Sequence, residues 1–460
     1  MQEITEGTRS TPVVAEADVV VCGGGPGGFA AAIAAARHGA KTALIERYGF
    51  MGGLATAGLV APILGHTASR SQRPIVEGIL REITERMHAI NGCPTWEESL
   101  QDWGVRFDAE ALKIVLDEMV AEAGVELFLH SYVADTVVDD GAIKAVLIEN
   151  KSGRQAVAGC VFIDGTGDAD VAARAGAPTT HGRPFDNKPE SMGSFFHLAG
   201  FEPVSQERAK ELVEMVRSES EKGRFSFYNV NFLGCNAYHD DHTAANMTRF
   251  SGSSASGADM TAAELSIRRD VWKLVRYLQQ NVPEFRHCYV QQTSPQVGPR
   301  ESRQIVGPYA LTGEDVRKGA KFDDAIARGS WWIDIHCPRG ETYPAHLCVK
   351  ECPKEAECPF WASEHTRMLS RKELYPPDDD WYDIPYRSIL SVGMPNLLST
   401  GRCISATHEG MAGSRVMGTC IAIGQAAGTA AALSTAAGVA PGELDAGRVQ
   451  DALRADGQLV

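Results

Sequence analysis

The chain has 460 residues, which is long enough for two domains or for one domain interrupted by another. Its 44 basic and 59 acidic residues give a formal net charge of −15, which disfavours nucleic-acid binding, and no basic stripe with interleaved aromatic residues offsets it. We see no run of 18 or more apolar residues and no secretory signal pattern, so we expect a cytoplasmic protein without a membrane span. The 11 cysteines are odd in number, which indicates mostly reduced thiols.

The first predicted element is a strand, a glycine turn and a helix. Residues 17–22 are apolar except for Asp18, and the Ala-rich residues 29–38 predict a helix after Gly23, Gly25 and Gly28. In a dinucleotide-binding turn the first glycine allows the tight bend and the second lets the backbone approach a pyrophosphate. The third glycine lets helix and strand pack closely. The N–H groups at the helix start would then face phosphates.

A second predicted strand ends at Glu46, 18 residues beyond Gly28. An acidic residue near this position binds a ribose hydroxyl in dinucleotide-binding folds. The turn serves NAD as well as FAD, so this motif alone does not name the cofactor. The other cofactor contacts predicted in this segment are Pro26, Gly27, Arg47, Gly53 and Thr56.

The stretch "FDAEALKIVLDEMVAEAG" predicts an amphipathic helix capped by Asp108, with Leu112, Val115, Met119 and Ala123 on one face. Further along, a buried strand leads into Gly165, Thr166, Gly167 and Asp168, and an Ala-rich helix follows. Asp168 has two open interpretations, a cofactor contact or only the N-cap of that helix.

In the middle of the chain, "TAAELSIRRDVWKLVRYLQQ" predicts a structural helix. Thr261 and Glu264 have the spacing of a capping box. The apolar stripe of this helix consists of Ile267, Val271, Leu274 and Leu278.

Four cysteines lie within 22 residues in a loop-like stretch: Cys337, Cys348, Cys352 and Cys358. Three of them precede a proline, but the spacing matches neither the ferredoxin run nor the paired motif of zinc ribbons. An iron–sulfur cluster or zinc site, a disulfide or redox pair, and unliganded thiols all remain open.

Near the C-terminal end, a buried strand precedes Gly401 and Arg402, and a long small-residue helix is predicted from about Met417. Arg415 lies in the glycine-bearing loop between them. A helix N-terminus favours negative charge, so this segment suits an anionic group of a bound ligand.

Taken together, these segments resemble the FAD-dependent oxidoreductases of glutathione-reductase fold. The resemblance rests on "GGGPGGFAAAIAAARHGAKTALIERYGFMGGLATAGLV", "TSPQVGPRESRQIVGPYALTGEDV", "WWIDIHCP", "DIPYRSIL" and "GRCISATHEGMAGSRVMGTCIAIGQAAGTAAAL", which spread from residue 18 to about 435. It implies FAD as the cofactor, with Gly165, Gly167 and Asp168 in a second turn over the adenosine side. The helix from Met417 would point at the flavin, with Gly401, Arg402 and Arg415 beside it.

The resemblance also implies the fold class, an α/β Rossmann-like FAD-binding domain interrupted by an α+β substrate or cap domain. We place the FAD-binding domain at residues 1–177 and 386–460 and the cap domain at residues 178–385. No second glycine fingerprint marks an NAD(P)H domain, and "TGRC" stands where flavin hydroxylases carry a Gly-Asp pair.

The candidate catalytic residues are His336, His408, Arg300 and Arg303. Transfer of a hydride to flavin leaves a substrate proton to be accepted, and histidine suits that task at neutral pH. Arginine would bind an anionic substrate group or compensate the reduced flavin. If the segment is a strand, Arg300 and Arg303 point to different faces, so at most one meets substrate.

We therefore predict an enzyme that transfers a hydride between flavin N5 and a small polar organic substrate such as an alcohol, an amine or an activated alkene. The alternatives are an electron-transfer component with a metal site in the cysteine loop, a flavin monooxygenase, and a binding protein that keeps a structural flavin. The electron donor or acceptor is unknown, and a homo-oligomer is compatible with the sequence.

Overall fold

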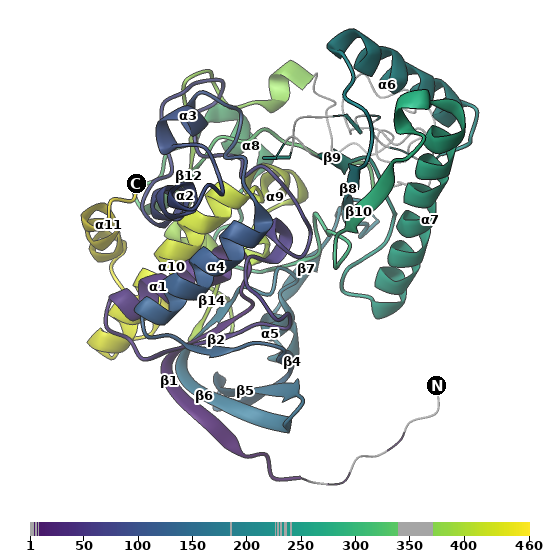
Figure 1. Cartoon of the computed structure of the whole chain (residues 1–460). Coiled ribbons are helices and arrows are strands. Elements are labelled where there is room, and N and C mark those ends of the chain that lie inside the picture. Colours follow the sequence, from purple (N-terminus) through teal and green to yellow (C-terminus); the bar gives the residue numbers. More distant parts are fainter. Residues whose placement is uncertain are drawn as a thin grey trace.

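The computed structural model describes residues 4, 7, 9–184, 186–225, 227, 230, 232–233, 237–239, 242–338 and 371–460 (Figure 1). Its centre is a seven-stranded sheet with strand order β3-β2-β1-β6-β5-β4, in which β14 also pairs with β6. The strands are β1 (Val13–Cys22), β2 (Thr42–Ile45), β3 (Glu126–Phe128), β4 (Tyr132–Asp139), β5 (Ala142–Asn150), β6 (Gly153–Asp164) and β14 (Leu397–Ser399).

The middle of this sheet is parallel. β1 pairs with β2 and β6, β2 pairs with β3, and β6 pairs with β14, all in parallel, whereas β4, β5 and β6 form an antiparallel meander. In this register Cys22 lies opposite both Ile45 and Asp164. The carboxyl ends of β1, β2 and β6 therefore meet at one edge, where ligands of open α/β sheets bind.

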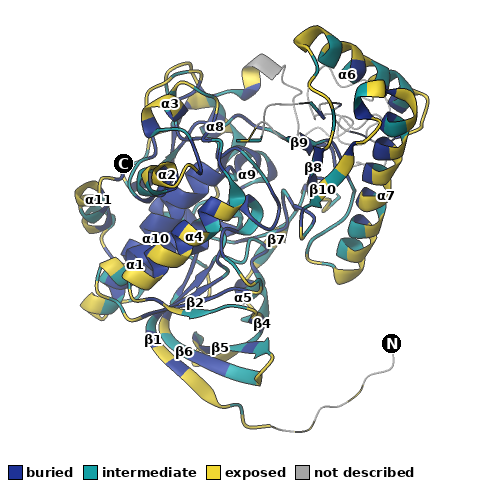
Figure 2. Ribbon diagram, in the orientation of Figure 1, coloured by how far each residue is buried: buried dark blue, intermediate teal, exposed yellow. Residues whose placement is uncertain are grey.

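Two helices from opposite ends of the chain pack against each other over this sheet: α1 (Pro26–Arg37) and α10 (Met417–Ala437) (Figure 1). A Cβ atom added at Gly424 or Gly428 would lie 2.1 or 2.0 Å from the carbonyl oxygen of Gly27 or Ala31. The two helices are thus in backbone contact. Among the described residues, α10 alone is long and apolar enough to cross a membrane, and most of it is buried inside the protein (Figure 2).

A smaller antiparallel sheet has β8 (Phe195–Ala199) between β9 (His242–Asn246) and β10 (Tyr289–Thr293). Helices α6 (Gln206–Glu221) and α7 (Gly257–Asn281) cover it on the side away from α1 and α10, and their outer faces are exposed (Figures 1 and 2). This part has its own hydrophobic core, which includes Phe196, Leu212, Phe225, Leu274 and Phe285.

The remaining elements surround the two sheets. They are α2 (Ile79–Ala89), α3 (Trp96–Leu100), α4 (Ala109–Glu122), α5 (Asp170–Arg174), β7 (Thr179–His181), β11 (Arg303–Ile305), α8 (Gly313–Lys318), β12 (Ala325–Gly329), β13 (Tyr382–Pro385), α9 (His408–Ser414) and α11 (Ala446–Ala455). Short 3₁₀ turns occupy Gly53–Ala55, Pro283–Phe285, Arg371–Leu374, Tyr386–Ser388, Gly401–Cys403 and Pro441–Glu443.

The chain returns to the first core before the predicted end of the cap domain. Leu311, Ile326 and Tyr382 all pack in the core that surrounds α1 and α10. The α/β fold class is confirmed. The inner part of the insertion has a separate hydrophobic core. The domain boundaries at residues 177 and 385 stay a prediction.

Two helix predictions have different outcomes. Asp108 caps α4 by accepting from the Glu110 N–H at 2.8 Å, as expected. The Thr261 capping box is wrong, because α7 begins at Gly257 and Ser256 caps it. The Thr261 hydroxyl instead donates to the Gly257 carbonyl, and Glu264 accepts from the Val297 N–H. The stripe Ile267, Val271, Leu274 and Leu278 is buried, as predicted.

Candidate active site at a nucleotide-binding pocket

The glycine turn after β1 requires residues without side chains at two close approaches. Gly23 has a φ of 97°, and a Cβ there would lie 2.5 Å from the Gly165 carbonyl oxygen. A Cβ on Gly28 would lie 1.7 Å from the Gly23 carbonyl oxygen. Gly25 is the N-cap of α1 and has no side chain to cap it, and Pro26 is the first helical residue. The first N–H groups of α1 are thus directed at the pocket.

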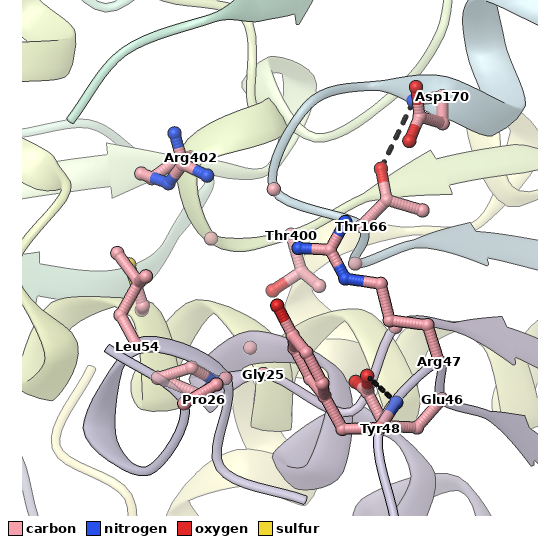
Figure 3. A pocket seen from close by; sticks show the side chains of 18 of the residues that line it. Gly25, Pro26, Glu46, Arg47, Tyr48, Leu54, Thr166, Asp170, Thr400 and Arg402 are labelled. Atoms are coloured by element: carbon pink, nitrogen blue, oxygen red, sulfur yellow. Dashed lines mark hydrogen bonds between the residues drawn. The ribbon is translucent and has the colours of Figure 1, made fainter. Parts of the chain in front are cut away.

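Glu46, which directly follows β2, stabilises this turn through hydrogen bonds. Its Oε2 accepts from the Gly24 N–H at 2.6 Å. Its Oε1 accepts from the Tyr48 N–H at 3.0 Å, a bond that is drawn in Figure 3. Burial raises the pKa of the Glu46 carboxyl, and the backbone donors oppose that rise. The carboxylate is therefore placed at the pocket with its orientation fixed.

A single pocket gathers most of the predicted cofactor residues from both ends of the chain (Figure 3). It encloses about 990 Å³ of non-protein space, open solvent at its mouth included. The predicted residues that line it are Gly23, Gly25, Pro26, Gly27, Glu46, Arg47, Gly53, Gly165, Gly167, Gly401, Arg402, Arg415 and Met417.

Three predicted cofactor residues do not line this pocket. Gly28 lies beneath the turn in contact with Gly23. The Thr56 hydroxyl donates to the Met51 carbonyl at 2.7 Å and so shapes the loop after β2. Asp168 accepts from the Ser254 hydroxyl at 2.7 Å and pairs with Arg402 at 3.4 Å.

Asp168 is also not the helix N-cap, so that interpretation was wrong. The N-cap of α5 is Ala169, in a left-handed conformation and without a side-chain cap. Asp164, at the end of β6, supplies the acceptors here: Oδ1 accepts from the Thr166 hydroxyl at 2.7 Å and Oδ2 from the Ala172 N–H at 3.0 Å.

The sequence reasoning missed several lining residues. They are Ile45, Tyr48, Leu54, Ala57, Ser131, Tyr132, Val133, Thr166, Asp170, Gln296, Pro299, Thr400 and Cys420. One signal was available for residues 131–133, because β3 runs parallel to β2 and the chain after it emerges at the same edge. Arg47 and Tyr48 extend over the pocket (Figure 3), and both are hydrogen-bonded to Gln296 from the middle of the chain.

Arg415 connects the pocket to a buried charged cluster that consists of Glu190, Glu301, Asp334, His336 and His408. Its Nε lies 3.3 Å from Glu190 Oε1, and its Nη2 donates to the Asp334 carbonyl at 2.8 Å. The Glu190 side chain has no exposed area, and that of Arg415 is 13% exposed. A guanidinium in a pocket at the N-terminus of α10 favours an anionic ligand group there.

His336 is a neutral imidazole in this cluster. Its Nδ1 lies 3.2 Å from Arg249 Nη2, and its Nε2 lies 3.4 Å from Asp334 Oδ2. Arginine only donates, so we assign Nδ1 as the acceptor and the proton to Nε2. Burial lowers the pKa of His336 well below its ordinary value; Asp334 opposes the shift, and Arg300 and Arg249 add to it.

His408 has the opposite charge state. Its side chain is fully buried, and Nδ1 lies 2.7 Å from Glu301 Oε2. Burial opposes the charge, but the Glu301 carboxylate outweighs that effect and raises the pKa of His408 to about 9. The other nitrogen, Nε2, has no hydrogen-bond partner within the part of the chain that the structure describes. The two candidate histidines therefore differ at neutral pH, one neutral and one protonated.

The two candidate arginines, Arg300 and Arg303, have different partners. Arg303 pairs with Asp170 and donates from Nε to the Asp168 carbonyl at 2.8 Å, so it anchors the start of α5. Arg300 donates to the Ser191 carbonyl at 2.9 Å and lies on the His336 side. Only Arg300 thus adjoins the charged cluster, and whether either arginine meets substrate stays a prediction.

The predicted metal loop lies mostly outside the described residues. Cys348, Cys352 and Cys358 fall there, while Cys337 is described and buried. Among the described residues, no group of three or more His, Cys, Asp or Glu side chains could bind a metal ion. The metal or iron–sulfur site remains a prediction.

Comparison with known proteins identifies the cofactor. The family model described as FAD dependent oxidoreductase matches residues 18–453. A dihydrolipoyl dehydrogenase of Trypanosoma brucei brucei is 56% identical over 45 residues, 10% of this chain and 9% of that protein. A soluble pyridine nucleotide transhydrogenase of Chromohalobacter salexigens is 39% identical over 79 residues, 17% of this chain and 16% of that protein. The chain therefore spans less than a fifth of either relative.

Solved structures of similar arrangement are distant in sequence. A geranylgeranyl bacteriochlorophyll reductase-like protein from Thermoplasma acidophilum has 12% identity and a TM-score of 0.42, with 96% of this chain and 83% of that chain covered. The flavin-dependent brominase Bmp2 has 13% identity and a TM-score of 0.39, with the same coverage of each chain.

Proposed function

Because this chain belongs to the FAD-dependent oxidoreductase family, we propose that it transfers a hydride between flavin N5 and a small polar organic substrate. The substrate would be an alcohol, an amine or an activated alkene. When bound, FAD supplies the two-electron acceptor or donor for this reaction. The protein contributes binding, orientation, exclusion of water and proton handling.

The residues of the pocket fit FAD. The turn at Gly25 leaves open space, since a Cβ there would meet nothing closer than 3.8 Å, and the start of α1 offers N–H groups to a pyrophosphate. The oriented carboxylate of Glu46 suits a ribose hydroxyl. At the other end, Arg402, Arg415 and the uncapped start of α10 suit a flavin that becomes anionic on reduction.

The observation that carries the proposal is the buried charged cluster attached to the pocket through Arg415. Neutral His336 is the base for substrate oxidation: its unprotonated Nδ1 would accept the substrate proton in place of the hydrogen bond from Arg249, and Asp334 beside Nε2 would stabilise the imidazolium that forms. Protonated His408 holds a proton at Nε2 for the reverse direction. Arg300 orients an anionic or polar group of the substrate.

The test is reduction of the flavin by substrate without oxygen. FAD-loaded protein is mixed with panels of small hydroxy acids, alcohols and amines, and the visible flavin absorbance is followed. Bleaching by one class, slowed at least about tenfold in His336→Gln, supports the proposal, since general base catalysis contributes about 10²–10⁴-fold. Flavin reduced by NAD(P)H alone, with oxygen consumed and an oxygenated product, would replace it with the monooxygenase alternative.

Iron and sulfide analysis of the same preparation tests the electron-transfer alternative. Stoichiometric iron would move the cysteine loop into the reaction. A flavin that no metabolite or nicotinamide reduces would indicate a structural cofactor.

A further inference from the structure

Two buried glutamates, Glu190 and Glu301, adjoin the cofactor pocket without lining it. Neither side chain has exposed area. Glu301 Oε2 accepts both from His408 Nδ1 at 2.7 Å and from the Glu190 N–H at 2.8 Å. Glu190 Oε2 accepts in turn from the His336 N–H at 2.8 Å. These contacts form one continuous path between the two histidines.

The cluster retains unsatisfied polar atoms. Glu190 Oε1, Glu301 Oε1, His408 Nε2 and Arg415 Nε are all buried without a hydrogen-bond partner among the residues that the structure describes. The contact of 3.3 Å between Arg415 Nε and Glu190 Oε1 is close enough for an ion pair but lacks hydrogen-bond geometry. Most buried polar groups are satisfied, so this concentration needs an explanation, which catalytic and ligand-binding groups and ordered water each provide.

We propose that Glu190 is a positioning residue that orients Arg415 at the cofactor pocket and offsets its charge, and thereby tunes the reduction potential of the bound flavin. The inference rests on FAD binding at this pocket and does not depend on which substrate is oxidised.

The charges of Arg415 and Glu190 determine in which direction the reduction potential of the flavin changes. Two-electron reduction makes the flavin anionic, so a cation at the pocket stabilises the reduced form. The Glu190 carboxylate, in contact with Arg415, weakens that stabilisation. Burial raises the pKa of Glu190 and Glu301 adds to that rise, whereas Arg415, His408 and the His336 N–H oppose it. The ion pair at 3.3 Å with Arg415 is made by the charged form of Glu190. A neutral side chain of the same shape should leave more positive charge for the reduced flavin.

The experiment compares Glu190→Gln with the unmodified protein, both loaded with FAD. The midpoint potential is measured by anaerobic equilibration with a reference dye, together with FAD stoichiometry and thermal stability. We expect Glu190→Gln to favour reduced flavin at least tenfold, a rise of about 30 mV for a two-electron couple. A purely structural role would change stability without raising the potential.

The matched control is Glu409→Gln, which removes a charge beside His408 from a half-buried residue outside the cluster. It should change the ratio of reduced to oxidised flavin less than threefold. An unchanged or lowered potential in Glu190→Gln, or an equal rise in the control, overturns the proposal. If Glu190→Gln does not fold, Asp334→Asn removes the other carboxylate that contacts Arg415, at 3.5 Å. It must raise the potential likewise, and no rise overturns the proposal.

Discussion

Replacement of Gly428 by alanine tests whether backbone contact between α10 and α1 builds the cofactor pocket. On its own, this change favours a helix by about 0.8–1 kcal/mol. In the protein, the new Cβ would lie 2.0 Å from the Ala31 carbonyl oxygen and 2.8 Å from the Ala31 Cα, whereas ordinary contacts begin at 3.4 Å. The helices would have to move apart by more than an ångström. Overpacking of this kind costs about 1–3 kcal/mol and occasionally more.

We expect a net loss of about 2 kcal/mol, because the contact falls on backbone atoms that cannot rotate away. For an FAD-binding domain of roughly 250 residues the loss corresponds to a fall in Tm of roughly 4 °C. Thermal unfolding by circular dichroism measures it, and fluorescence titration measures FAD affinity, which should fall because α1 and α10 both begin at the pocket.

The matched control is Gly447→Ala in α11, where a Cβ meets nothing closer than 3.4 Å. That variant should be as stable as the unmodified protein or slightly more stable. If Gly428→Ala has an unchanged or higher Tm, or if both variants fall equally, backbone contact between α1 and α10 does not limit the fold.

Two further predictions concern the carboxylates. Glu46→Gln replaces a charged acceptor of the Gly24 N–H with a neutral one. Because hydrogen bonds to charged groups contribute about 1.5–3 kcal/mol, FAD should bind on the order of 10–100-fold more weakly. Equal affinity of both proteins in a fluorescence titration would contradict the role of Glu46. Glu301→Gln should remove a pH-dependent part of stability. His408, which Glu301, Glu409 and Glu190 face, has a pKa raised to about 9 from 6.5. Its stabilisation is complete below about pH 6.5 and is lost as pH rises through about 9. The Tm difference between the unmodified protein and Glu301→Gln should therefore be largest near pH 6 and shrink toward pH 9; a constant difference would refute the ion pair.

The local sequence pattern predicted those elements in which each glycine is required by one close approach of the backbone. The turn after β1, with Gly23 against Gly165 and Gly28 against Gly23, is specified by spacing alone, because no other residue fits these approaches. The start of α10 at Met417 was likewise predictable from its small residues. The family match confirms the cofactor that these segments implied.

Features that depend on tertiary contacts were not predictable from local sequence. Thr261 and Glu264 have capping-box spacing, but α7 extends one turn earlier, and Glu264 is used by a loop more than 30 residues away. Gln296 reaches Arg47 and Tyr48 only because the insertion folds back over the pocket. The opposite charge states follow from burial, Arg300 and Arg249 around His336 and from Glu301 beside His408, and no local spacing reveals these contacts.

The packing of α1 against α10 also has a consequence for biosynthesis. The pocket takes its walls from residues near 23–57, from 131–170, from Gln296 and Pro299 and from 400–420, so the flavin site cannot close until residue 420 has left the ribosome. Until then the face of α1 that contains Ala31 lacks its partner helix and remains apolar and uncovered. Closure of the flavin site therefore waits for the synthesis of α10, and until then the apolar face of α1 is exposed to aggregation.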